Sequence, residues 1–162
     1  MGSHQSHKSL KQEWLTPPEI LHALGEFDLD PCAPVDRPWP MARSHYTIAD
    51  NGLSQPWFGR VWCNPPYGVE TGKWLARLAA HGNGLALIFA RTETAMFFTH
   101  VWGKARALLF LKGRLHFYNN DGSRAPGNAG APSVLAAYGK NNAAILERCG
   151  LAGQFIALVT ND

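Results

Sequence analysis

Short apolar runs alternate with amphipathic segments along most of the chain, and this alternation restricts the possible folds more than any other feature. Strand-like runs occupy residues 27–30, 61–63, 85–90, 107–111, 133–138 and 154–159, and helical periodicity marks residues 19–24, 73–80, 94–102 and 141–149. Strands that alternate with helices are typical of an α/β domain with helices on both faces of its sheet. We therefore predict a compact α/β fold with a mainly parallel sheet.

Irregular segments interrupt this alternation. Residues 31–57 are rich in proline and predict a long surface loop, and residues 119–132 predict a polar, glycine-rich one. Thr16 precedes Pro17, a pattern typical of a helix start with Thr16 as the N-cap. Ligands bind such sheets beyond the carboxyl ends of the strands. We therefore expect a site where residues 30–33 and 64–67 follow their strands.

The length and composition suit a single domain. The chain has 162 residues, 46% of them hydrophobic, which is enough for a core. We assign residues 13–162 to one domain and residues 1–12 to a flexible N-terminus or cloning scar. No apolar run reaches membrane-spanning length, so no membrane partner is expected. The three cysteines lack paired spacing, which predicts neither a disulfide framework nor a metal site and indicates a cytoplasmic protein.

Positive charge is concentrated in the second half of the chain. Residues 1–70 hold 5 Lys/Arg against 8 Asp/Glu, and residues 71–162 hold 10 against 4, for a net charge of +3. A basic half favours an anionic partner such as nucleic acid. A solvated basic face without a partner is the alternative.

Residues 62–68 read WCNPPYG, a rigid polar turn directly after a predicted strand. An amine on an aromatic or carbonyl carbon is a poor nucleophile, and two acceptors aimed at its N–H groups favour a more tetrahedral nitrogen. The Asn64 side-chain oxygen and the Pro65 carbonyl can be these acceptors, because Pro65 and Pro66 offer no competing N–H donor. Tyr67 can stack on a planar substrate. The turn therefore suits methyl transfer to an amine.

The asparagine, two prolines and tyrosine resemble the signature of the amino-methyltransferases. Residues 27–33 (FDLDPCA), 46–53, 61–68, 90–92 and 113–117, together with Trp14 to Pro17 and Trp57, resemble the phage-type DNA N6-adenine methyltransferase (Dam) family in order and spacing. The resemblance runs from about residue 13 to about residue 138. It implies a compact Rossmann-like methyltransferase fold without a separate target-recognition domain. It also implies S-adenosylmethionine as cofactor, and double-stranded DNA with a flipped-out adenine as substrate.

The resemblance also implies roles for individual residues. The expected catalytic residues are Asn64, Pro65, Pro66 and Tyr67. The expected cofactor-binding residues are Thr16, Pro17, Asp30, Pro31, Cys32, Ala33 and Asp50, with Asp30 at the cofactor's ammonium and Asp50 at its adenine amine. The basic second half and the family pattern give Arg91, Lys112, Arg114, His116 and Arg124 as DNA-binding candidates. Phe117 either faces the flipped base or packs in the core.

Two alternatives remain open at the level of the sequence. Protein glutamine and RNA amino-methyltransferases use the same turn, although they usually keep a glycine-rich first motif that is absent after Asp30. A DNA-binding relative with a decayed cofactor site is the second alternative, which the missing glycines favour and the intact turn at residues 64–67 does not. The sequence leaves open whether the protein is a monomer or a weak dimer.

Overall fold

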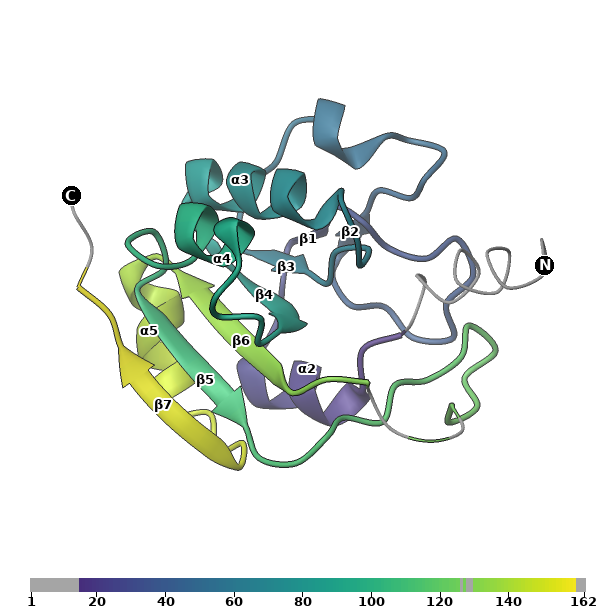
Figure 1. Ribbon diagram of the computed structural model, residues 1–162. Coiled ribbons are helices and arrows are strands. Elements are labelled where there is room, and N and C mark those ends of the chain that lie inside the picture. The colour runs from purple at the N-terminus through teal and green to yellow at the C-terminus, as the bar shows by residue number, and fades with distance from the viewer. Residues whose placement is uncertain (1–14, 126, 128–129, 160–162) are drawn as a thin grey trace, which may run out of the picture.

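The structure is a computed structural model, which describes residues 15–125, 127 and 130–159. The N-terminal segment 1–12 and Trp14 lie outside the described residues. One sheet of seven strands runs through the centre of the molecule, in the order β2-β1-β3-β4-β6-β5-β7 (Figure 1). The strands are β1 (Leu29–Asp30), β2 (Ser44–His45), β3 (Val61–Cys63), β4 (Gly84–Phe89), β5 (Ala107–Leu111), β6 (Ser133–Tyr138) and β7 (Gly153–Ala157).

The sheet is mixed, so the prediction of a mainly parallel sheet is wrong. β1 pairs in parallel with β2 and β3, and β3 with β4, whereas the pairs β4–β6, β5–β6 and β5–β7 are antiparallel. Parallel neighbours need a crossover, usually a helix. The described residues between β5 and β6 form no helix, and the chain returns as β6 alongside β5 in the opposite direction. β1 to β5 still share one direction, and their carboxyl ends meet at one edge.

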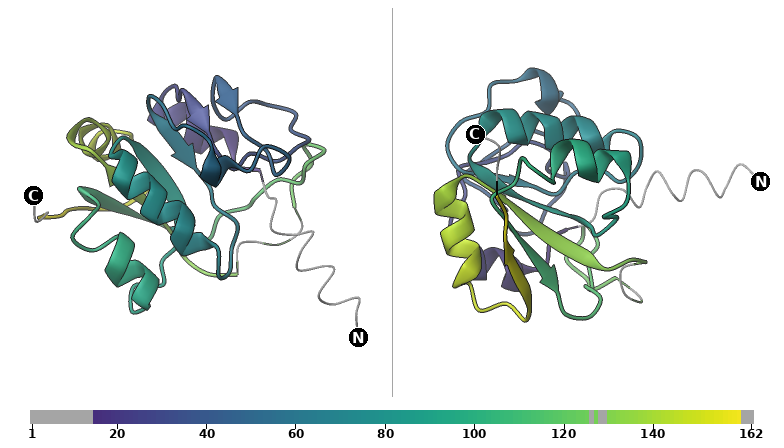
Figure 2. Two further views of the ribbon diagram at one scale, coloured as in Figure 1. Left: turned by 90° about the horizontal axis from the view of Figure 1, so that it is seen from above. Right: turned by 60° about the vertical axis from the view of Figure 1, so that its left-hand side comes forward.

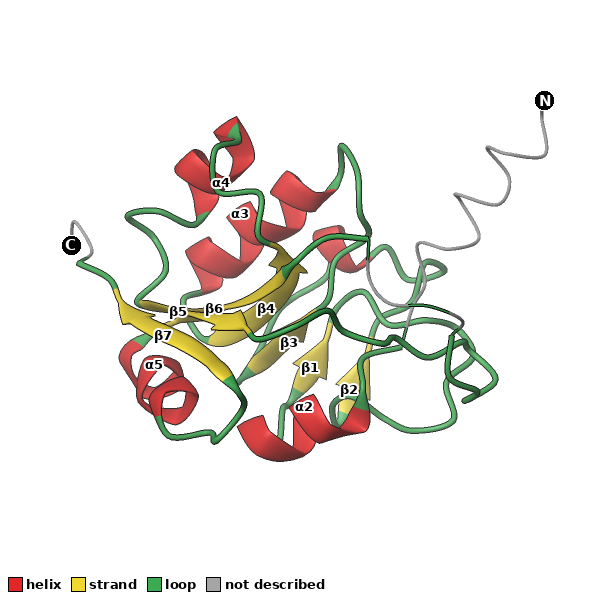
Figure 3. Ribbon diagram, turned by 60° about the horizontal axis from the view of Figure 1, so that its bottom comes forward, coloured by secondary structure: helices red, strands yellow, loops and turns green. Residues whose placement is uncertain are grey.

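Helices cover both faces of the sheet, as predicted (Figure 3). On one face lie α2 (Pro18–Leu24) and α5 (Lys140–Glu147), and on the other lie α3 (Thr71–His81) and α4 (Ala95–His100). Leu24 and Leu146 pack with Trp62 and Leu85 on the first face. Leu75, Phe97 and Ile88 belong to the core of the second face. The side chains of each strand alternate between these two cores.

Several predicted element bounds match the structure and others differ. Residues 61–63, 107–111 and 133–138 form strands as predicted. The other predicted helices and strands are present with ends shifted by a few residues. The segment 31–57 is not only loop, because it contains β2 and a short 3-10 helix, η1 (Gly52–Ser54). Both elements are too short to show a periodic pattern.

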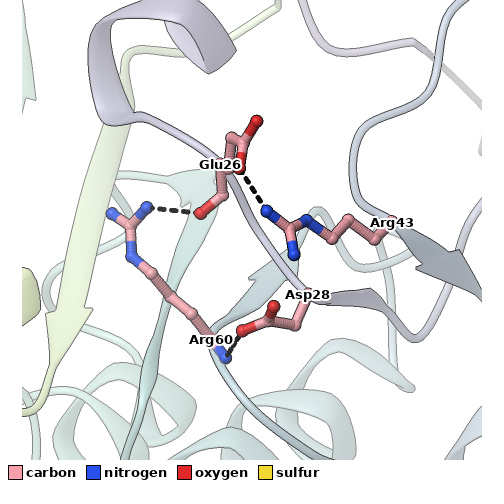
Figure 4. A network of polar contacts seen from close by, with 4 residues as sticks. All are labelled: Glu26, Asp28, Arg43 and Arg60. Carbon is pink, nitrogen blue, oxygen red and sulfur yellow. Dashed lines mark hydrogen bonds and ion pairs between the residues drawn. The ribbon is translucent and has the colours of Figure 1, made fainter.

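The amino ends of β1 and β3 are held by a polar network (Figure 4). The Arg43 guanidinium pairs with the Glu26 carboxylate at 2.6 Å. The Arg60 amide donates to the Asp28 carboxylate at 2.7 Å, and the Arg60 side chain donates to the Glu26 carbonyl at 3.0 Å. These contacts fix the entry into the strands on the edge opposite to the predicted site.

Long loops meet at the carboxyl edge. The segment that follows β5 lies beside the proline-rich segment that follows β1 (Figure 2). The rings of Trp39 and Tyr118 meet edge to face, with centroids 5.3 Å apart, and Leu15 forms a backbone bridge with Tyr118. Three parts of the chain that are distant in sequence therefore enclose one side of the carboxyl edge. No helix in the described part of the chain is long and apolar enough to cross a membrane.

Candidate functional site

A cavity of about 620 Å³ lies where β1 and β3 end. It is enclosed by the loops after these two strands, by the loop that leads into η1, by the start of α3 and by Asn120. Its walls include five of the predicted cofactor-binding residues, Thr16, Asp30, Pro31, Cys32 and Ala33, and two residues of the predicted catalytic turn, Asn64 and Pro66. Pro17 and Asp50 are not among its lining residues. The structure thus brings two predicted groups of residues to one cavity.

Asp30 is a buried acidic group in the cavity wall. Its side chain is only 2% exposed and accepts from the Cys32 amide at 3.1 Å. Within the described residues, no lysine or arginine forms a salt bridge with it. Burial raises the pKa of the Asp30 carboxyl from 3.8 to about 7, although the Cys32 amide and the Arg37 charge act in the opposite direction. A cation in the cavity would therefore meet a carboxyl that ionises near neutral pH.

Asp50 lies on the surface, where it closes a turn. Its carboxylate accepts from the Thr47 amide at 2.8 Å and from the Thr47 hydroxyl at 3.3 Å. The residues that follow, Asn51 to Leu53, do line the cavity. The structure therefore places the Asp50 segment at the site but uses this carboxylate to shape the loop.

Gly52 holds this loop against the Asp30–Ala33 segment. A Cβ at position 52 would overlap the Pro31 carbonyl oxygen, so only glycine allows this approach. The Trp57 indole donates to the Gly52 carbonyl at 2.9 Å and keeps the loop in place. From the sequence no role is predicted for Gly52, and Trp57 enters only through the family pattern. An Asn-Gly pair is common in ordinary turns, and nothing in the local sequence indicates this close packing.

Two of the backbone carbonyls in the Asn64–Tyr67 turn accept hydrogen bonds from side chains. The Cys32 thiol donates to the Asn64 carbonyl at 3.4 Å, and the Thr71 hydroxyl donates to the Pro66 carbonyl at 2.6 Å. Among the residues that the structure describes, none donates to the Pro65 carbonyl between them. The two flanking carbonyls are therefore used to fix the turn, and the middle one remains as an acceptor.

The Asn64 side chain is oriented by Thr16. The Asn64 amide nitrogen and the Trp62 indole nitrogen both donate to the Thr16 hydroxyl oxygen, each at 3.2 Å. The prediction that Thr16 caps a helix is wrong, because α2 begins after Pro17 and no side chain caps its first turn. Thr16 is 1% exposed and its hydroxyl faces β3 instead of the helix. The Asn64 amide oxygen consequently points away from Thr16.

Tyr67 already has an aromatic partner in the protein. Its ring stacks on Phe89 at the end of β4, with centroids 4.2 Å apart and planes inclined by 12°. A planar substrate can therefore use only the other face of the Tyr67 ring. Burial raises the pKa of the Tyr67 hydroxyl, so it stays protonated and cannot act as a base. The contact with Phe89 could not be predicted, because residues 85–90 show only the pattern of a core strand and the pairing of β3 with β4 appears only in the fold.

The predicted DNA-binding residues lie at the same edge of the sheet as the cavity. Arg91 follows β4 and is exposed, and its guanidinium carbon lies 5.9 Å from the centre of the Phe89 ring. Lys112, Arg114 and Arg124 are exposed and His116 is half-buried, all in the segment after β5. Part of the predicted loop 119–132 lies outside the described residues. Phe117 is buried in the core on the α2 face.

The cysteines form no disulfide in the structure. Cys32 and Cys63 lie side by side with their sulfur atoms 4.0 Å apart, and Cys149 lies apart from them near α5. Within the described ranges, no group of three or more His, Cys, Asp or Glu side chains could hold a metal ion.

The comparison with known families agrees with the resemblance of the motifs. A family model described as DNA N-6-adenine-methyltransferase (Dam) matches residues 3–146. No curated protein and no solved structure matches the chain.

Proposed function

The chain belongs to the DNA N-6-adenine-methyltransferase (Dam) family, and we propose that it transfers a methyl group from S-adenosylmethionine to N6 of an adenine flipped out of duplex DNA. The observation that carries this proposal is the Asn64–Tyr67 turn at the edge of the cavity. A compact Rossmann-like fold is supported by the shared direction of β1 to β5 and by helices on both faces.

The turn can accept two protons from one amine. The Pro65 carbonyl has no donor among the described residues, and the Asn64 amide oxygen is turned away from Thr16. Two acceptors on one amino group weaken the conjugation of its nitrogen lone pair with the ring and make the nitrogen a better nucleophile. The Cys32 thiol donates to the Asn64 carbonyl and the Thr71 hydroxyl donates to the Pro66 carbonyl, so neither group competes for these two acceptors.

The cavity residues fit S-adenosylmethionine. The buried Asp30 carboxyl has no cationic partner in the described structure, and the cofactor carries an ammonium group that would pair with it. Ile48, Leu53 and Trp74 give the cavity an apolar side that suits the adenine ring. When bound, S-adenosylmethionine supplies an electrophilic methyl group, and the amine that accepts it needs to lose only one proton, which water can take.

DNA as the substrate is supported by the charge and by the aromatic stack. The exposed cations after β4 and β5 can contact phosphates, which are the main source of affinity for duplex DNA. Flipping one adenine costs a few kcal/mol, and stacking on the face of the Tyr67 ring opposite to Phe89 can offset part of this cost. The stack with Phe89 fixes the orientation of the Tyr67 ring for that contact.

Methyl transfer with a radiolabelled donor tests this proposal. The full-length protein is incubated with methyl-tritiated S-adenosylmethionine in three parallel reactions. Each reaction contains one candidate acceptor, which is duplex DNA, RNA or a mixture of proteins. We expect label in duplex DNA only, and nucleoside analysis should find it in N6-methyladenine. Label in RNA or in protein glutamine would instead support the alternative substrates, and no label in any sample would support a decayed DNA-binding relative.

A further inference from the structure

The Thr16 hydroxyl contacts one side chain of β3 and one side chain of the turn that follows β3. Trp62 is the second residue of β3 and Asn64 lies two positions later, so both side chains point to the same face of the sheet. Thr16 lies on that face, where its oxygen is 3.2 Å from the Trp62 indole nitrogen and 3.2 Å from the Asn64 amide nitrogen. One buried hydroxyl therefore connects the core to the predicted catalytic side chain.

The Thr16 backbone is itself fixed in place. Leu15 exchanges backbone hydrogen bonds with Tyr118 at 3.0 and 3.3 Å. The Trp39 indole donates to the Thr16 carbonyl at 3.3 Å. Because these contacts come from two other segments of the chain, the Thr16 hydroxyl has a defined position relative to β3.

An asparagine amide has two orientations of nearly equal shape, and hydrogen bonding selects between them. If the Asn64 oxygen faced Thr16, the NH₂ group would point toward the incoming amine, which is also a donor, and the two would repel. A hydroxyl oxygen has two lone pairs, and the Trp62 indole can only donate. In the structure the Trp62 indole nitrogen and the Asn64 amide nitrogen each donate to the Thr16 oxygen at 3.2 Å, so both lone pairs are used.

We propose that Thr16 is a positioning residue for the methyl transfer, and that its hydroxyl holds the Asn64 amide with the oxygen directed toward the substrate amine. This inference rests on the proposed function for the identity of the substrate. It assigns to Thr16 a role different from that of a helix cap or a direct contact of the cofactor. The hydrogen bond itself exists in the protein alone, so it can be tested without cofactor or DNA.

The first test observes the Asn64 side chain by NMR in the free, full-length protein. The side-chain amide signals of Asn64 are assigned by their loss in Asn64→Asp. We expect slow hydrogen exchange at one Asn64 amide proton in the wild type and faster exchange in Thr16→Val, which removes the hydroxyl and keeps the shape. Thr16→Ser keeps the hydroxyl and should restore slow exchange. Equal exchange in wild type and Thr16→Val would overturn the inference.

Removing the hydroxyl also leaves the Trp62 indole without its acceptor, which can weaken the fold. The double variant Thr16→Val/Trp62→Phe removes that indole donor as well, and it replaces Thr16→Val if the single variant does not fold. Thermal unfolding followed by circular dichroism checks all variants. The expected faster exchange of the Asn64 amide is the same in this background.

The second test is a kinetic double-mutant cycle at saturating cofactor and DNA. We expect Thr16→Val to lower kcat about ten- to hundredfold with a smaller change in KM, and Thr16→Ser to recover most of the rate. In the Asn64→Ala background the same Thr16→Val change should alter kcat by less than about twofold, because its effect passes through Asn64. If Thr16→Val lowers kcat by the same factor with and without Asn64→Ala, the inference is overturned. Wild-type protein that labels no substrate would instead contradict the proposed function, while the NMR result would still decide the hydrogen bond.

Discussion

Asp30 combines a cost for the fold with the cofactor contact that we propose for it. It is buried and is held by one backbone amide, and burial raises its pKa to about 7. A structural role alone would not require a carboxyl at this position, because an amide of the same shape would be easier to bury. Asp30 lines the cavity, and this position supports the cofactor contact that we propose.

Asp30→Asn should stabilise the free protein at high pH. The folded pKa lies above the unfolded value of 3.8, so between pH 4 and 7 the folded protein keeps a proton that the unfolded chain has lost. The contribution of Asp30 to the free energy of unfolding therefore falls as the pH rises through that window. We expect the variant to be more stable than the wild type by roughly 1–4 kcal/mol at pH 8 and equally stable near pH 4. Urea unfolding at both pH values measures this, and a constant difference would contradict it.

The same substitution should weaken cofactor binding. Loss of a charge-assisted hydrogen bond costs about 1.5–3 kcal/mol, which is roughly a 10- to 100-fold loss of affinity for S-adenosylmethionine. At pH 6 the free carboxyl is mostly protonated, and pairing with an ammonium group would ionise it. Calorimetric titration in buffers of different ionisation enthalpy should therefore detect nearly one proton released by the wild type and almost none by the variant. Equal affinity and equal proton release would show that Asp30 does not contact the cofactor.

At the scale of the element, the site depends on loops whose backbones pack directly against one another. η1 and the segment after β1 approach each other at Gly52, and the 64–67 turn is fixed by hydrogen bonds from Cys32 and Thr71. The approach of Gly52 to Pro31 and the hydrogen bond from Cys32 to Asn64 join segments that are distant in sequence, whereas Thr71 follows the turn directly. The cavity is therefore defined by how these loops pack.

Gly52→Ala should open the cavity. Its methyl group would overlap the Pro31 carbonyl, so the loop must move, at a cost of about 1–3 kcal/mol in stability and with weaker cofactor binding. Gly130→Ala is the matched control, because a Cβ there meets no heavy atom within 4 Å. Thermal unfolding and cofactor titration measure both variants. Identical behaviour of the two would show that this contact does not shape the site.

The sequence predicted those elements whose pattern is local. Val61–Cys63 is a fully buried run bounded by polar residues, and the structure has the same strand there. The two residues of β2 have no such pattern, and they become a strand only because their backbone pairs with Leu29 and Asp30. The Thr16 hydroxyl was assigned to a helix cap from its neighbours, whereas its partners lie 46 and 48 positions later. Contacts of this kind depend on the packed fold and leave no trace in local spacing.

At the scale of the whole molecule, the carboxyl edge of the sheet carries both the cavity and the exposed basic residues. β4 and β5 run in the same direction, so Arg91 and the segment after β5 are on one edge with the 64–67 turn. The opposite edge carries the network of Glu26, Asp28, Arg43 and Arg60. The cavity and the polar network therefore lie at opposite edges of the sheet.

Duplex DNA binding should depend on salt through the basic residues at the carboxyl edge. Each phosphate contact contributes about −0.9 to the slope of log affinity against log salt concentration. We expect Lys112→Ala/Arg124→Ala to reduce the magnitude of the slope by roughly two, measured by fluorescence anisotropy. Arg43→Ala, which removes a cation from the opposite edge, should leave the slope unchanged. Equal slopes in all three proteins would place the DNA elsewhere on the surface.

The rate of methyl transfer by Asn64→Ala tests the central claim most directly. The claim is that the Asn64 side chain and the Pro65 carbonyl accept the two protons of the adenine amine. Loss of one such acceptor should lower kcat by about 10²–10³-fold, by analogy with the loss of an oxyanion-hole donor, and leave cofactor affinity and fold nearly intact. The measurement is tritiated methyl transfer into duplex DNA, with N6-methyladenine as the only labelled nucleoside in the wild type. A folded Asn64→Ala protein that methylates adenine at the wild-type rate would contradict the account.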